Sequence, residues 1–169
     1  MMRPASTLLW LLLGWTALGV LAAIGWLPLA AWLAFAALLA VVAALDARQL
    51  RAEPSPVLGR ELPPVVPLGP ELVVGLRLRP QGKRTLAFEL HDLHPGGWPV
   101  RGMPRQLSLP PGRELALDYA LTPTGRGRFD FAGSHLRLRS PWRLWTQRRT
   151  IGEPASLRVY PNFAPLARM

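Results

Sequence analysis

The residues best suited to chemistry are His91, Asp92 and His94, which come just before a Pro-Gly-Gly loop. With His135 they provide three imidazoles and one carboxylate, a ligand set that Zn²⁺ accepts. Residues three positions apart on an extended strand point to opposite faces, so His91 and His94 converge only if the strand ends between them. We therefore interpret these residues as capping a strand end and bonding loop backbone, and we expect no metal site and no other cofactor.

Two other patterns match catalytic or phosphate-binding motifs only in part. The serines at 108, 134, 140 and 156 lack the Gly-x-Ser-x-Gly elbow that exposes a nucleophile. The segment 125–128 reads Gly-Arg-Gly-Arg, but no helix is expected after it whose amino terminus would bind a phosphate. The chain has no cysteine, which excludes disulfides, thiolate metal sites and a cysteine nucleophile. We predict a non-enzymatic protein without catalytic residues.

Arginine and tryptophan side chains give the best candidates for an interaction surface. Arginines occupy the outward positions of several expected strands, and the simplest interpretation is a solvated face that resists aggregation. The alternative is a docking surface for a partner or for lipid phosphates, because tryptophan and arginine are enriched where proteins bind one another. The residues of this candidate surface are Arg137, Arg139, Trp142, Arg143 and Trp145.

The overall charge is strongly basic, with 20 Lys and Arg against 10 Asp and Glu. Single-stranded nucleic acid would require exposed rings on a basic sheet face. Phe129, Phe131 and Tyr119 instead share the alternation of the leucines and are expected in the core. Acidic partner surfaces and anionic lipids are therefore the expected partners, and nucleic acid is not.

The charge is absent from the first part of the chain, since no Asp, Glu, Lys or Arg occurs from Pro4 to Leu45. One helix of that length would rise about 63 Å, roughly twice the hydrocarbon thickness of a bilayer. Gly25-Trp26-Leu27-Pro28 interrupts the run with residues that favour a turn. We predict two membrane helices, from about Leu8 to Ile24 and from about Leu29 to Leu45.

The charges on either side of this hairpin indicate its orientation. Arg3 precedes it, Arg48, Arg51 and Arg60 follow it, and the turn carries none. By the positive-inside rule both ends face the cytoplasm. We therefore expect a multi-pass protein of the inner (cytoplasmic) membrane.

Two alternatives to a hairpin remain open. A cleaved signal peptide would explain Arg3, the leucines after it and the small residues at 22–23, but it leaves the apolar stretch from Ala30 to Leu45 without a purpose. A buried helical hairpin of a soluble protein would normally carry a polar face, and in place of one these helices show only Thr7, Thr16 and scattered glycines.

The remainder of the chain has the period of β-strands. Residues 47–70 are rich in proline and are expected to form a stiff linker that merges into a first edge strand. From residue 71 to 163 apolar and polar residues alternate in short runs, for example at Leu72, Val74, Leu76 and Leu78. The predicted fold class is a two-helix transmembrane hairpin (1–46) followed by an all-β, immunoglobulin-like sandwich (71–163), with a truncated tail at 164–169.

Three segments resemble one known family. Residues 122–129 (TPTGRGRF), 136–145 (LRLRSPWRLW) and 158–163 (RVYPNF) are similar in type, order and spacing to the membrane-proximal half of bacterial proteins of the domain-of-unknown-function 58 (DUF58) family. The resemblance implies two amino-terminal membrane helices, a β-sandwich and then a larger region similar to a von Willebrand factor A domain. The chain stops where that region would begin, so we expect either a fragment, which is the preferred interpretation, or a short member whose A-like domain is a separate polypeptide.

The resemblance also implies a partner, because members of the family are associated with AAA ATPases of the MoxR type. We predict a membrane-anchored scaffold or interaction protein. The alternative is an exported, membrane-tethered β-sandwich that binds a glycan or a peptide.

Overall fold

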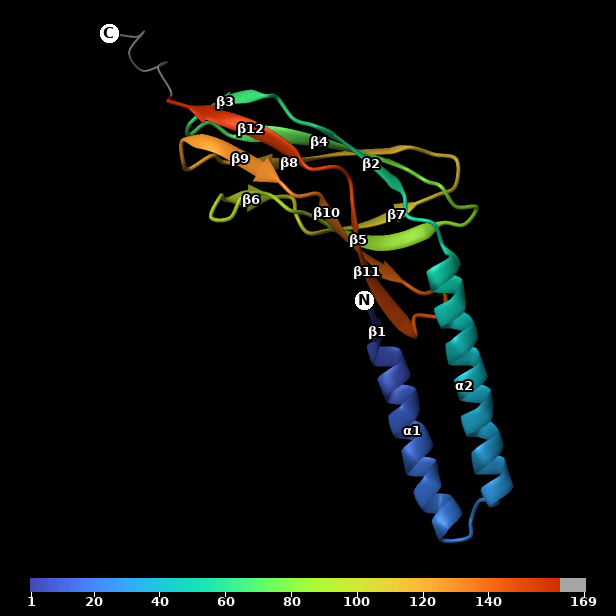
Figure 1. Ribbon diagram of the computed structural model, residues 1–169. Helices are drawn as coiled ribbons and strands as arrows, with labels where there is room; N and C mark the ends of the chain where they lie inside the picture. The colour runs from blue at the N-terminus through green and yellow to red at the C-terminus, as the bar shows by residue number, and fades with distance from the viewer. Residues whose placement is uncertain (162–169) are drawn as a thin grey trace. The chain divides into compact units, whose positions relative to one another are not determined.

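The computed structural model describes residues 1–161 of the chain (Figure 1). Its residues group into two compact units, which we describe separately. The smaller unit contains Met1–Pro54 and Arg137–Arg148, and the larger contains Ser55–Leu136 and the segment from Arg149 onward. Two long apolar helices followed by a β-sandwich confirm the predicted fold class.

The smaller unit is built on a helical hairpin. Helix α1 spans Ser6–Ala23 and helix α2 spans Leu29–Ala52, and both are long and apolar enough to cross a membrane. Gly25 adopts a φ of +80° in the turn between them, and Pro28 comes directly before α2. Helix α2 continues to Ala52 instead of ending near Leu45, so the boundary expected at residue 46 falls inside a helix.

A pair of tryptophans joins the two helices. The rings of Trp15 and Trp32 are stacked, with centroids 4.6 Å apart and planes inclined by 7°. Trp32 Nε1 donates to the carbonyl of Trp15 at 3.0 Å, and Trp15 Nε1 donates to the carbonyl of Trp32 at 3.4 Å. Gly19 leaves the space for this pair, because a Cβ atom there would lie 3.2 Å from Trp32 Nε1.

A short strand that precedes the hairpin pairs with a strand that follows it much later. Strand β1 (Met2–Pro4) runs antiparallel to β11 (Trp145–Ile151), with Arg3 opposite Thr146 and Pro4 opposite Trp145. The sequence analysis did not predict β1, since three residues carry no readable alternation. The pairing holds the chain before α1 beside the chain after β10 (Ser134–Arg139).

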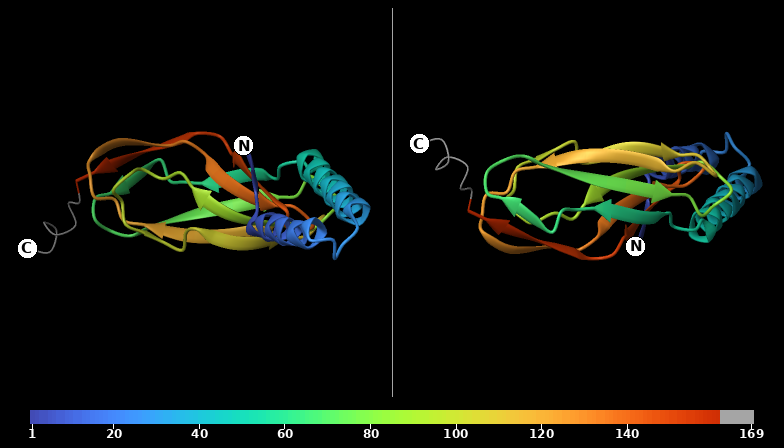
Figure 2. Two further views of the ribbon diagram at one scale, coloured as in Figure 1. Left: turned by 90° about the horizontal axis from the view of Figure 1, so that it is seen from below. Right: turned by 90° about the horizontal axis from the view of Figure 1, so that it is seen from above.

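The larger unit is the sandwich, and Figure 2 shows its strands from two opposite sides. One sheet has the order β2-β4-β8-β6 and a second has the order β3-β12-β9, while β5 pairs with β7. Strands β3 and β12 are parallel, whereas the pairs β9–β12, β2–β4, β4–β8, β6–β8 and β5–β7 are antiparallel. The strands are β2 (Val57–Glu61), β3 (Val65–Pro67), β4 (Leu72–Arg79), β5 (Leu86–Asp92), β6 (Val100–Arg101), β7 (Arg105–Leu109), β8 (Leu115–Leu121), β9 (Gly127–Phe131) and β12 (Ala155–Tyr160).

The sandwich forms because apolar residues alternate along its strands. In β4 the buried residues are Leu72, Val74, Leu76 and Leu78, which are the residues whose spacing predicted one buried face. Tyr119 and Phe131 lie in the core as expected, while Phe129 is half-buried and packs edge-on against Trp98 with centroids 4.7 Å apart. Each fully buried leucine or phenylalanine contributes about 1.5–3 kcal/mol of transfer free energy.

The region expected as a proline-rich linker contains more regular structure than its composition suggested. Residues 47–70 include the end of α2 and the strands β2 and β3. The prolines lie mostly outside these elements, at positions such as Pro54, Pro63 and Pro64. The expected tail at 164–169 and the last two residues of the expected sandwich, 162–163, lie outside the described residues.

Candidate functional site

A tight turn at residues 140–145 connects β10 to β11 and carries three of the five residues of the candidate interaction surface. Ser140 N donates to the carbonyl of Trp145 at 2.9 Å, and Arg143 N donates to the carbonyl of Ser140 at 2.9 Å. Arg143 has a φ of +59°, a left-handed conformation that glycine adopts with less strain. We call this segment the 140–145 turn.

The 140–145 turn is held by the carboxylate of Asp46 in helix α2. Asp46 is fully buried and accepts hydrogen bonds from Ser140 Oγ at 2.5 Å, Trp142 N at 3.0 Å and Leu144 N at 3.2 Å. Ser140 Oγ also accepts a hydrogen bond from Trp145 N at 2.9 Å. A buried carboxylate is stable when several donors replace its water, and this turn provides them.

A second contact fixes the end of the 140–145 turn. Trp145 Nε1 donates to the carbonyl of Ala43 in α2 at 2.8 Å. Asp46 and Ala43 lie about one helical turn apart, so the 140–145 turn is bound to one side of α2 at two successive levels. Within the smaller unit, helix α2 and the 140–145 turn therefore form one hydrogen-bonded assembly.

The structure separates the predicted surface residues into two groups. Trp145 is half-buried against α2, so its indole N–H is not available to a partner. Exposed side chains belong to Arg137, Arg139, Trp142 and Arg143, and Trp142 retains 46 % of its accessible surface. Among the described residues, no Asp or Glu forms an ion pair with these three arginines. The exposed part of the surface therefore presents guanidinium groups and one indole.

The histidines expected near a strand end do not share a ligand set with Asp92. Asp92 is fully buried and accepts hydrogen bonds from the Tyr119 hydroxyl, the Ser134 hydroxyl and the Arg60 guanidinium. The rings of His91 and His94 lie edge to face with centroids 5.8 Å apart. Among residues 1–161, no group of three His, Cys, Asp or Glu side chains has an arrangement that would hold a metal ion.

Arg60 is the cation that compensates Asp92. Its Nη2 lies 2.5 Å from Asp92 Oδ1 and its Nε lies 3.2 Å from Asp92 Oδ2, while the guanidinium also donates to the carbonyls of Gly133 and Glu153. Burial, the charge of Asp92 and the hydrogen bond to it raise the pKa of Tyr119 above its usual range. These buried groups join strands β2, β5 and β8 to residues 133–134, and every oxygen of Asp92 is engaged, so the cluster is structural.

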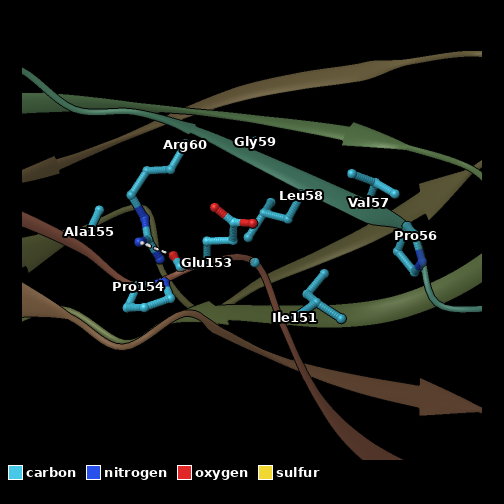
Figure 3. Close-up of a pocket in the computed structure, with 10 residues that line it drawn as sticks. Pro56, Val57, Leu58, Gly59, Arg60, Ile151, Glu153, Pro154 and Ala155 are labelled. Atoms are coloured by element: carbon cyan, nitrogen blue, oxygen red, sulfur yellow. Dashed lines mark hydrogen bonds between the residues drawn. The ribbon is translucent and has the colours of Figure 1, made fainter.

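A hollow of about 600 Å³ lies beside the edge strand β2, as Figure 3 shows. It is lined by residues 56–60 and 151–155. Its charged side chains are Arg60, whose guanidinium is committed to Asp92, and Glu153. The hollow has no acid–base pair, but an edge strand with free backbone groups can accept an extended peptide.

The sequence analysis did not pair Asp46 with Ser140 and treated residue 46 only as the end of the helical hairpin. A signal was present, because Asp46 is the first charged residue after the apolar run and has a helix-forming sequence on both sides. Its partners lie 94 to 98 residues away, which no local pattern reveals.

Comparisons with protein-family models and with curated proteins give no significant match to this chain. Several solved structures are similar to this chain in fold but share little sequence identity with it. Native alpha-2-macroglobulin of E. coli aligns with 63 % of this chain at 13 % identity and a TM-score of 0.47, and the aligned part spans 7 % of that protein. A CARDB domain from Pyrococcus furiosus, solved in complex with di-metal ions, aligns with 65 % of this chain at 13 % identity and a TM-score of 0.44, over 96 % of its own length. A FixG-related protein from Vibrio parahaemolyticus aligns with 62 % of this chain at 10 % identity and a TM-score of 0.37, over 94 % of its length.

Proposed function

We propose that this chain is a non-enzymatic protein of the inner membrane that anchors a β-sandwich there and presents it to a partner. One observation carries the proposal: α1 and α2 leave their apolar side chains exposed. In the most apolar 18-residue stretch of each helix, only 6 % of the residues of α1 and 11 % of those of α2 are buried. Side chains such as Leu9, Leu13, Leu33 and Leu38 are 53–59 % exposed, so keeping each of them in water rather than in hydrocarbon costs roughly half of the about 1.5–3 kcal/mol of a full transfer. A bilayer is the solvent that fits them.

The pairing of β1 with β11 supports a hairpin rather than a cleaved signal peptide. Cleavage after the small residues at 22–23 would remove β1, leaving the edge of β11 unpaired. In a hairpin that crosses the bilayer twice, β1 and β11 emerge on the same side and can pair. Arg3 precedes α1, and Arg48 and Arg51 lie in the last two turns of α2, so the positive-inside rule favours the cytoplasmic side for these ends.

Of the exposed residues of the candidate surface, Arg139, Trp142 and Arg143 are the proposed contact with an acidic partner. Arginine and tryptophan are the residues that most often dominate binding energy at interfaces. The family resemblance favours an AAA ATPase of the MoxR type, or a separate A-like domain, as that partner. Because the 140–145 turn is bound to Asp46, the contact would be presented at a constant position relative to α2.

Topology can be tested with reporter fusions. An alkaline phosphatase fused after Pro161 should be inactive in cells, and a green fluorescent protein at the same position should be fluorescent. The full chain should remain in the membrane pellet after washing with alkaline carbonate. Strong phosphatase activity would contradict the cytoplasmic orientation, and release by carbonate would contradict the anchor.

The partner can be tested by capture from a membrane extract with the full chain as bait. A MoxR-type ATPase should be retained by the unmodified chain and lost with Arg139→Gln and Arg143→Gln together, two exposed arginines that do not line the pocket described below. The matched control is Arg126→Gln with Arg158→Gln, which removes the same charge from exposed positions of the sandwich. Equal retention by both pairs of variants would contradict this surface as the contact.

A second candidate function is an exported sandwich that binds an extended peptide. The hollow beside the edge strand β2 favours it, because main-chain groups of β2 are available on that side. An active phosphatase fusion, together with peptide binding that is lost on Val57→Pro, would favour this function over the first.

A further inference from the structure

A pocket of about 350 Å³ in the smaller unit is lined by Met1, Arg3, Arg137, Thr146 and Arg148. Pockets of about 300–1,000 Å³ are the size that holds small ligands. Three of the five lining residues are arginines, and none is acidic. We call it the three-arginine pocket.

The pairing of β1 with β11 explains why these side chains converge. Residues directly opposite each other in an antiparallel pair point to the same face, and so do residues two apart on one strand. Arg3 is opposite Thr146, and Met1 exchanges backbone hydrogen bonds with Arg148. Arg3 and Arg148 therefore share one face of the ribbon, and the neighbouring strand β10 adds Arg137.

The three-arginine pocket has no internal compensation for its charge. Among the described residues, no Asp or Glu forms an ion pair with Arg3, Arg137 or Arg148. By contrast, the exposed Arg77, Arg79 and Arg101 of the sandwich each have a glutamate partner within 3.0 Å. Three guanidinium groups held around one pocket repel each other, and an anion that enters removes this repulsion. The planar, forked guanidinium matches the oxygens of a phosphate group.

We propose that the three-arginine pocket binds the phosphate of an anionic phospholipid at the cytoplasmic surface of the membrane. The site extends the proposed function and rests on it, because the ligand is available only if the hairpin is embedded. Arg3 lies three residues before the start of α1, which is at most about 10 Å of extended chain. The polar head groups occupy about 5–8 Å on each side of the hydrocarbon core. Arg3 is therefore within reach of lipid phosphates when α1 spans the bilayer.

The position favours a lipid over an acidic protein as the ligand. A protein surface would have to enter the narrow zone at the base of α1, whereas lipid head groups already fill it. The pocket is also distinct from the exposed tip of the 140–145 turn, since neither Trp142 nor Arg143 lines it. One unit would thus bind lipid phosphate at β1 and present its turn to a partner.

The test measures lipid retention by the full chain in detergent micelles, using native mass spectrometry. Phosphatidylglycerol should be retained over phosphatidylcholine, and Arg137→Gln with Arg148→Gln should weaken this retention about tenfold or more. The control pair Arg126→Gln with Arg158→Gln should retain phosphatidylglycerol as the unmodified chain does. Arg137→Lys with Arg148→Lys should fall between the two, since lysine keeps the charge but loses the forked geometry.

Four results would overturn the site: equal retention of the two lipids, no loss in the Arg→Gln pair, equal loss in the control pair, or inorganic phosphate competing as strongly as the lipid. Tighter binding of an acidic peptide than of phosphatidylglycerol would assign the pocket to a protein instead. Carbonate washing of the same variants keeps the two proposals apart. The variant with Arg137→Gln and Arg148→Gln should stay in the membrane, because only the pocket is changed. Release of the unmodified chain would instead contradict the proposed membrane anchor.

Discussion

The carboxylate of Asp46 accepts a hydrogen bond from the hydroxyl group of Ser140 at 2.5 Å, across 94 residues of sequence. The same carboxylate accepts hydrogen bonds from the backbone N–H groups of Trp142 and Leu144, and among the described residues no Lys, Arg or His forms an ion pair with it. This carboxylate and the hydrogen bond from Trp145 Nε1 to the carbonyl of Ala43 connect helix α2 to the turn between β10 and β11.

We predict that Asp46→Asn destabilises the chain by about 2–3 kcal/mol, because an amide has a single acceptor oxygen and its NH₂ would face donors. Ser140→Ala should cost about 1–3 kcal/mol, since it leaves Asp46 with one donor fewer and Trp145 N without its acceptor. In a double-mutant cycle the two losses should not add. Thermal unfolding in detergent measures each value. Asp118→Asn, at an exposed position, is the control, and an equal loss there would contradict the assignment.

Arg143→Gly should separate stability from binding. Glycine accepts the φ of +59° without the cost that a side chain imposes there, so the melting temperature should stay equal or rise slightly. The same change removes an exposed guanidinium from the 140–145 turn, so retention of the partner should fall. Retention equal to that of the unmodified chain would show that Arg143 lies outside the contact.

Arg60→Ala should be among the most damaging single changes in the sandwich, at about 3–5 kcal/mol, because it leaves the buried Asp92 without its cation. Arg77→Ala is the matched control, since Arg77 pairs with Glu61 at the surface, where about 0–1 kcal/mol is expected. Denaturant unfolding of the full chain in detergent compares the two variants. Similar losses would show that burial does not determine the value of these ion pairs.

Alkaline pH should weaken the sandwich through Tyr119. Its pKa is raised in the folded state above the value of 10.0 that it has when unfolded. The contribution of the Tyr119 hydroxyl to the free energy of unfolding is therefore complete below pH 10.0. It is lost progressively as the pH rises above that value, by up to about 1.4 kcal/mol per pH unit. Tyr119→Phe should be less stable at neutral pH, having lost its bond to Asp92, but its stability should fall less steeply above pH 10.0. Equal slopes for the two proteins in thermal melts would contradict this role.

The helical hairpin should respond differently to the same substitution at two glycines. Gly19→Leu places a side chain against Trp32 and should separate the stacked tryptophans, reducing their near-ultraviolet circular dichroism and lowering the melting temperature. A Cβ atom added at Gly14 would have no neighbour within 4 Å, so Gly14→Leu should change neither. An effect of equal size at both positions would mean that general helix changes, not the Trp15–Trp32 contact, are being measured.

The hairpin was predictable because an uncharged run about twice the length of one membrane span is interrupted by residues that favour a turn, and the sandwich was predictable because apolar and polar residues alternate along its strands. The run without charge predicted two helices, and the alternation of apolar residues in β4 predicted which face of that strand is buried. The end of α2 was not predictable from hydropathy, since a charged residue at position 46 normally marks a boundary, whereas here Asp46 lies inside the helix and accepts hydrogen bonds from the 140–145 turn.

The candidate site was predictable in its residue types but not in its geometry. The exposure of Arg137, Arg139, Trp142 and Arg143 follows from alternation and from the turn, both of which are local. The engagement of Trp145 with Ala43 depends on a contact over 102 residues, and the three-arginine pocket depends on β1, which is too short to recognise.

The pairing of Asp46 with the 140–145 turn also orders events during synthesis. The ribosome releases α1 and α2 first, and the carboxylate of Asp46 must wait in water until the segment that bonds it has been translated. Membrane insertion and completion of the smaller unit are therefore separated in time by most of the sandwich. A nascent chain interrupted before Ser140 would be anchored yet unfinished, with an ionised carboxylate at the base of the anchor that protein quality control could detect.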